Sequence, residues 1–201
     1  QMRVEANLFY TDIRDSFQVV ERDDPGTPEQ TEFVRTNGSG SEVYGIELNT
    51  GLVRSGLFSL DAGIVLQRAR YDVPEPDFGS LRLLRTPQVT GVASFTWRGW
   101  RPWELFVGMK YTGPMKVPHY AGFIPEDRLE TAEPFLTLDA NISRRIPLSA
   151  NDSTALVLKL GAKNLTDEYQ EDLDRGPNRD AGYVYGPRFP RTIYTSAQIE
   201  F

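Results

Sequence analysis

Alternation of apolar and polar residues with a period of two recurs through nearly the whole chain. In 136–143, every second residue from Leu136 to Ile142 is apolar, and Thr, Asp, Asn and Ser occupy the other positions. This spacing is typical of a β-strand with two unlike faces. No segment shows a convincing helical period, so the sequence predicts an all-β protein. Eight segments carry the pattern: 3–11, 41–53, 59–67, 87–98, 104–111, 136–143, 156–163 and 192–201.

The connections between these segments alternate in length. The short ones lie at 54–56, 99–102 and 146–152, and the long, polar ones at 21–31, 70–86, 113–132 and 167–190. Connections of one kind therefore fall at one end of the sheet, as in outer-membrane barrels with short periplasmic turns and long external loops. Several segments also have the ~10 to 14 residues that suit a tilted membrane strand. We expect an antiparallel up-and-down transmembrane β-barrel.

Composition excludes several other classes of protein. The 22 Lys and Arg against 28 Asp and Glu give a net charge of −6, which argues against a nucleic-acid partner because such partners require a basic patch. With no cysteine and one histidine, the chain can form neither a disulfide nor a multi-histidine metal site. Mean hydropathy is −0.42, and no apolar run approaches the ~18 residues of a membrane helix.

Aromatic residues occupy two positions typical of membrane barrels. The only tryptophans, Trp97, Trp100 and Trp103, flank one short connection. Indole rings prefer the membrane–water boundary, so we interpret them as an aromatic girdle; a chance cluster is the alternative. The last segment carries Ile199 and Phe201 on its apolar face. A final Phe resembles the signal by which barrel-assembly machinery recognises its substrates; an ordinary terminal strand is the alternative.

Four short sequence pieces, taken in order, carry a family resemblance. They are GAKNLTDEY at 161–169, PRT at 190–192 before a last segment that closes on Phe, VYGIEL at 43–48 and NLFYTDI at 7–13. Together they resemble the C-terminal end of the TonB-dependent outer-membrane receptors, along nearly all of the chain. The connection at 172–187 is similar to a version of the family found in Bacteroidota.

The resemblance implies a parent barrel of about 22 strands, with an N-terminal plug and a segment that contacts TonB. Residues 1–201 would be its last eight strands, and the plug and earlier strands would lie outside this chain. It implies a receptor in the outer membrane of a Gram-negative bacterium that takes up a scarce nutrient, such as a ferric siderophore or cobalamin, surrounded by lipid. It implies neither an enzyme nor a cofactor.

Arginines near the predicted external ends are candidate ligand-binding residues, because guanidinium groups suit carboxylate and phosphate geometry. Binding of lipopolysaccharide phosphates and simple solvation are the alternatives. The four candidates are Arg68, Arg70, Arg82 and Arg85.

Acidic residues of the last long connection are weak calcium candidates, since hard cations favour carboxylate oxygens. Their spacing falls short of an EF-hand, and the alternative is that Arg175 and Arg179 pair with them and order the loop. The three acids are Asp172, Asp174 and Asp180.

Enzymatic activity has no support in the sequence. No nucleophile elbow, phosphate loop or zinc-protease helix is present, and His119 lies in a Pro-rich connection, where we expect it to be solvated. Two other interpretations remain open: a complete eight-stranded barrel with a structural or adhesion role, and a soluble all-β binding module whose Leu face packs on another sheet.

Overall fold

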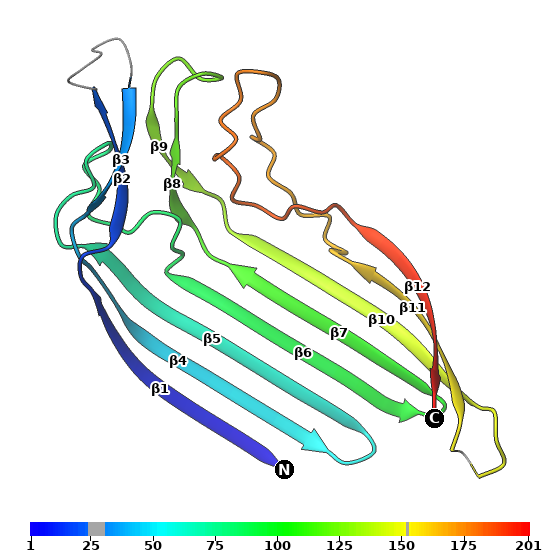
Figure 1. Cartoon of the computed structure of the whole chain (residues 1–201). Helices are drawn as coiled ribbons and strands as arrows, with labels where there is room; N and C mark the ends of the chain where they lie inside the picture. The colour runs from blue at the N-terminus through cyan, green and yellow to red at the C-terminus, as the bar shows by residue number, and fades with distance from the viewer. Residues whose placement is uncertain (24–30, 152) are drawn as a thin grey trace.

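A computed structural model describes residues 1–23, 31–151 and 153–201, with no side-chain description for 18–33. Its main sheet has eight strands, all paired antiparallel with their neighbours along the chain (Figure 1). The predicted all-β, up-and-down architecture is therefore confirmed. No helix in the described parts of the chain is long and apolar enough to span a membrane. The strands are β1 (Met2–Ile13), β4 (Ser41–Arg54), β5 (Phe58–Tyr71), β6 (Val89–Trp100), β7 (Trp103–Thr112), β10 (Phe135–Pro147), β11 (Ala155–Lys163) and β12 (Thr192–Glu200).

Two hairpins extend the sheet at the end where the long connections lie (Figure 1). They are β2 (Phe17–Asp23) with β3 (Thr31–Asn37), and β8 (Met115–His119) with β9 (Arg128–Ala132). The sequence analysis predicted no strand within 113–132. That prediction was wrong because β8 is short and contains Pro118, which breaks the usual strand signal but is tolerated in a strand with a free edge. The predicted 21–31 connection is shorter than expected, because residues 21–23 belong to β2 and residue 31 to β3; residues 24–30 lie outside the described residues.

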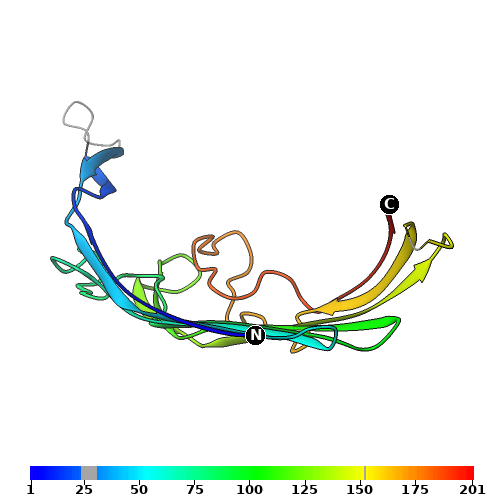
Figure 2. The ribbon, with the colours of Figure 1, turned by 90° about the horizontal axis from the view of Figure 1, so that it is seen from below.

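The sheet is curved, and the connection at 164–191 lies on its concave side (Figure 2). Phe135 of β10 packs on Tyr185 of that connection, so Phe135 and every second residue after it face the concave side. The register carries this assignment to the other strands, because directly opposite residues share a face. The concave face is polar and includes Asn49, Asp61, Ser94, Lys110, Asp139, Asn141 and Lys159. The convex face is apolar and includes Leu48, Leu60, Leu66, Phe95, Met109, Leu138, Leu158 and Leu160.

The apolar core lies under the long connections, not between two sheets. Its buried cluster is Val117, Ala132 and Tyr183. On the convex face, Leu8 is 84% exposed and Leu160 is 53% exposed, and no second sheet in the described residues covers them. The soluble module with a packed Leu face is therefore not what the structure shows. β1 and β12 form the two edges of an open sheet, so these residues also do not close into a small barrel.

Candidate functional site

Three long connections meet at one end of the sheet and hold one another in place. They are the 72–88 connection, the β8–β9 hairpin and the 164–191 connection. The Arg85 guanidinium donates a 2.7 Å hydrogen bond to the carbonyl of Gly182, and the Tyr120 hydroxyl donates a 3.1 Å bond to Asp77. Because each bond joins two connections, the loop end is a single interlocked structure.

His119 lies at the centre of this structure. Its side chain is buried, its Nε2 atom lies 3.0 Å from an Asp174 carboxylate oxygen, and its ring stacks on Tyr183 with centroids 3.6 Å apart. The other ring nitrogen, Nδ1, is buried without a hydrogen-bond partner among the described residues. The prediction of a solvated histidine was wrong, because the 164–191 connection folds back over the hairpin and covers the ring.

Asp172 joins two tyrosines of the same connection. The hydroxyls of Tyr183 and Tyr185 each donate a 2.6 Å hydrogen bond to its carboxylate. Burial alone raises the pKa of Asp172, but these hydrogen bonds outweigh it and the pKa is lowered overall. Burial, and then the bond to Asp172, raise the pKa of both tyrosines. The two phenols thus remain neutral donors to an ionised carboxylate.

The other two acids that the sequence analysis named, Asp174 and Asp180, also accept hydrogen bonds within the loop end. Asp174 accepts from His119 and from the backbone N–H of Asp180 at 3.0 Å. Asp180 accepts from the backbone N–H groups of Tyr120 and Gly182. Within the described chain, no group of three His, Asp or Glu side chains is arranged to hold a metal ion.

The arginines expected to pair with these acids do not do so in the described residues. Arg179 instead donates to the carbonyl of Gly176 at 3.0 Å, and Arg175 forms no ion pair with a described residue. Backbone N–H groups, phenols and one imidazole therefore order the connection.

The structure divides the four candidate arginines between β5 and the 72–88 connection. Arg68 and Arg70 lie opposite Tyr44 and Glu42 in the β4–β5 pair, which places them on the convex face. Arg70 forms an ion pair with Glu42. Arg82 and Arg85 belong instead to the 72–88 connection. Arg82 is paired with Arg70 in an isolated antiparallel bridge, whereas Arg85 donates to the carbonyl of Gly182 in another connection.

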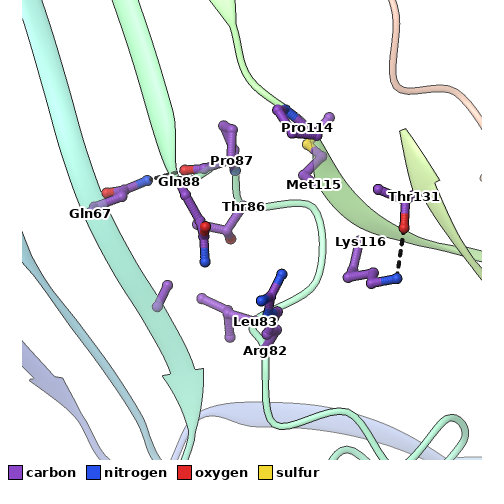
Figure 3. A pocket seen from close by; sticks show the side chains of 11 residues that line it. Gln67, Arg82, Leu83, Thr86, Pro87, Gln88, Pro114, Met115, Lys116 and Thr131 are labelled. Carbon is purple, nitrogen blue, oxygen red and sulfur yellow. Dashed lines mark hydrogen bonds between the residues drawn. The ribbon is translucent and has the colours of Figure 1, made fainter. Parts of the chain in front are cut away.

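A small cavity of about 90 Å³ lies between β5, the 72–88 connection and the β8–β9 hairpin (Figure 3). Arg82 borders it from one side and Lys116 from the hairpin. The Lys116 ammonium donates a 2.6 Å hydrogen bond to the hydroxyl of Thr131. Sequence reasoning missed Lys116, because nothing along the chain relates a lysine of one connection to an arginine 34 positions earlier in another.

The tryptophans gather on the convex face at the short-turn end. Trp97 lies opposite Leu105, and its ring stacks on Phe58 with centroids 6.5 Å apart. Trp100 lies opposite Trp103, where the two strands approach the turn. This arrangement is compatible with an aromatic girdle, which stays a prediction.

The proposed assembly signal also lies on the convex side. Ile199 is opposite Leu156 on that face, and Phe201 is 97% exposed beyond the end of β12. The role of these two residues in barrel assembly stays a prediction.

Short turns at one end, interlocked connections at the other and an apolar convex face define a segment of an outer-membrane-type β-barrel wall. The family model described as "TonB dependent receptor-like, beta-barrel" matches residues 1–165. The chain belongs to this family, as the four sequence pieces predicted. Members of the family are transporters and not enzymes, which confirms that prediction.

Several solved structures share the fold of this chain. The ferric-catecholate import receptor Fiu from Escherichia coli K12 matches at 21% identity with a TM-score of 0.65, over 99% of this chain and 25% of its own. The ferripyoverdine receptor of Pseudomonas aeruginosa matches at 13% identity with a TM-score of 0.66, over 99% of this chain and 25% of the receptor. The copper transporter OprC matches at 16% identity with a TM-score of 0.65, over 99% of this chain and 29% of the transporter. No curated protein sequence matches the chain. The chain thus spans about a quarter of the length of these structures.

Proposed function

We propose that this chain is the C-terminal part of the barrel of an outer-membrane receptor that takes up a scarce nutrient in a Gram-negative bacterium. The observation that carries the proposal is the division of the sheet into an apolar convex face and a polar concave face, with the long connections interlocked at one end. Lipid would cover the convex face. The nutrient would meet the loop end and pass along the concave side.

We propose that the nutrient is a metal complex, with a ferric siderophore favoured over cobalamin. Two of the similar structures are receptors for ferric complexes and a third is a copper transporter, as their names state. The work of such a protein is recognition and gated passage, with no bond chemistry. Its further partners would be TonB, acting through a plug outside this chain, and the barrel-assembly machinery.

Isolation of the intact protein from outer membranes tests the proposed architecture. We expect a mature chain several hundred residues longer than these 201, with a plug domain on the N-terminal side of Gln1. Intact mass and the full coding sequence are the measurements. A mature protein that begins near Gln1 would contradict the receptor proposal.

Uptake measurements test the proposed transport. We expect a deletion strain to lose accumulation of at least one 55Fe-labelled siderophore from a panel of catecholates, hydroxamates and citrate. The intact gene should restore accumulation, and a strain without TonB should not accumulate the complex even when the gene is present. Accumulation that is unchanged by the deletion for every complex would contradict the proposed substrate class.

A further inference from the structure

The cavity at the loop end is positively charged although the chain as a whole is acidic. Net charge is −6, yet the residues around the cavity include two cations, Arg82 and Lys116, and no Asp or Glu. The remaining polar groups are hydroxyls and amides, including those of Thr86, Thr131 and Gln88. A local reversal of charge inside a concave site is the pattern expected for an anion-binding site.

Some cations of the chain are neutralised by a neighbouring acid, and, within the described part of the chain, the two cations at the cavity are not. Arg98 pairs with Glu104 at 2.7 Å, and Arg128 pairs with Glu130 at 2.8 Å. In the described residues, neither Arg82 nor Lys116 forms an ion pair. Their charges are therefore available to a ligand.

The backbone holds both side chains at the cavity. The Leu83 N–H donates to the carbonyl of Ala69 at 3.1 Å, which ties Arg82 and its neighbours to β5. Lys116 belongs to β8, and its ammonium bonds to Thr131, its directly opposite partner in β9, as Figure 3 shows. Arg82 and Lys116 border the same small volume, and a guanidinium and an ammonium are both charge-assisted donors to an anion.

Cavity size limits what can bind. A volume of about 90 Å³ is well below the roughly 300 to 1,000 Å³ of sites that enclose a whole drug-sized ligand. It has room for one oxyanion group. We propose that the cavity binds a single carboxylate or phosphate group between Arg82 and Lys116. The group is carried either by the transported nutrient, in which case its role rests on the proposed function, or by a free anion.

Binding of inorganic phosphate to the intact, detergent-solubilised protein tests the site. Isothermal titration at low ionic strength should show saturable binding by the wild type. Arg82→Gln and Lys116→Gln should each weaken it at least tenfold, because each removes a charge-assisted hydrogen bond to the anion. The matched control is Arg128→Gln, which removes a cation of the same hairpin that already pairs with Glu130.

Four results would overturn the proposal. The first is that the wild type shows no saturable binding, and the second is that Arg82→Gln or Lys116→Gln keeps the wild-type affinity. The third is that the control loses as much affinity as the cavity variants. The fourth applies if both cavity variants lose their fold: the milder Lys116→Arg variant, which keeps the charge, then also fails to bind phosphate. Hydrogen exchange of the 164–191 connection reports whether each variant retains the loop structure.

Uptake in cells identifies the source of the anion. If Arg82→Gln and Lys116→Gln lower siderophore accumulation in parallel with phosphate affinity, the group belongs to the nutrient. If accumulation is unchanged while phosphate affinity falls, the site serves a free anion. If the wild type accumulates no complex but binds phosphate, the proposed function fails and the anion site stands.

Discussion

At the scale of single residues, the loop end is ordered mainly by hydrogen bonds between polar groups. Among the described residues, its buried apolar cluster consists of Val117, Ala132 and Tyr183, with Met115 and Tyr185 packed against it. The imidazole of His119 and the phenols of two tyrosines connect this small core to the acids around it. Removal of one such group therefore has a larger effect than the size of the core suggests, because a buried polar partner is left unsatisfied.

We expect Tyr183→Phe to weaken the 164–191 connection. The variant keeps the ring that stacks on His119 but removes the hydroxyl that donates to Asp172. The loss should be about 1–2 kcal/mol of local stability, measured as faster hydrogen exchange in this connection. The matched control is Tyr169→Phe, which removes a phenol oxygen from an exposed ring of the same connection. Equal exchange in the two variants would contradict this account.

The loop end should open at both extremes of pH. The pKa of Asp172 is lowered in the folded state from the ordinary value of 3.8. The stability that this carboxylate gives the loop end is therefore present above that pH and is lost as the pH falls below about 4. Burial and the bond to Asp77 raise the pKa of Tyr120 to about 12. The pKa values of Tyr183 and Tyr185 are raised as well. The stability that these three phenols give the loop end is complete below about pH 10, the ordinary pKa of tyrosine, and is lost as the pH rises above it.

Limited proteolysis of the intact protein between pH 3 and pH 11 measures this dependence. Cleavage within 164–191 should rise at both ends of the range. A Tyr183→Phe, Tyr185→Phe double variant should lose most of the alkaline rise, since two of the three phenols are gone. An alkaline rise as large as that of the wild type would show that other groups open the loop.

Sequence reasoning identified several residues of the loop end but not their roles. Asp172, Asp174 and Asp180 stood out as acids and suggested calcium, whereas their oxygens accept hydrogen bonds from phenols, an imidazole and backbone N–H groups. The partners of Asp172 lie in the same irregular connection, and those of Asp174 and Asp180 include residues of the β8–β9 hairpin, up to 60 positions away for Tyr120 and Asp180. Periodicity reports only local order, so long-range pairs between irregular segments leave no signal in one sequence.

At the scale of the strand, aromatic rings of edge strands cover glycines of the neighbouring strands. The ring of Phe9 lies over Gly45, and the ring of Tyr194 lies over Gly161. A Cβ at Gly45 would fall 2.3 Å from the carbonyl oxygen of Leu66, which is backbone and cannot move without disturbing the β4–β5 pair. Close approach therefore requires glycine at this position.

We expect Gly45→Ala to destabilise the sheet by about 1–3 kcal/mol, because the added methyl group strains backbone and ring together. Gly91→Ala is the matched control, since the nearest atom to its Cβ would be 3.6 Å away. The measurement is the free energy of unfolding of the intact protein in detergent or lipid. The account is wrong if the two alanine variants are equally stable.

Strands were the most predictable elements. Alternation located all eight strands of the main sheet, and only the ends differ: β6 runs to Trp100, through the predicted start of the 99–102 turn. A register shift between Trp97 and Trp100 explains this, because an irregularity interrupts the alternation without ending the strand. The β8–β9 hairpin escaped prediction because strands of five residues are too short to show a period, and β8 also contains a proline.

At the scale of the whole molecule, the two faces of the sheet should respond oppositely to charge. Ile64 lies on the convex face and Val65, its neighbour in β5, on the concave face. We expect Ile64→Lys to cost about 2–4 kcal/mol when the intact protein folds into vesicles, because a lysine on the lipid face meets the bilayer interior. Val65→Lys should cost much less. Equal costs would show that lipid does not cover the convex face.

The bonds between connections also limit how this protein can change its specificity. Asp77 with Tyr120, Arg85 with Gly182, and His119 with Asp174 tie three separate stretches of chain together. A segment grafted from a relative with another ligand would lose its partners on the other two and leave buried polar groups unmatched. New ligand preferences must therefore arise by coordinated change in all three stretches, or by substitution of side chains such as Arg82 that take no part in these bonds.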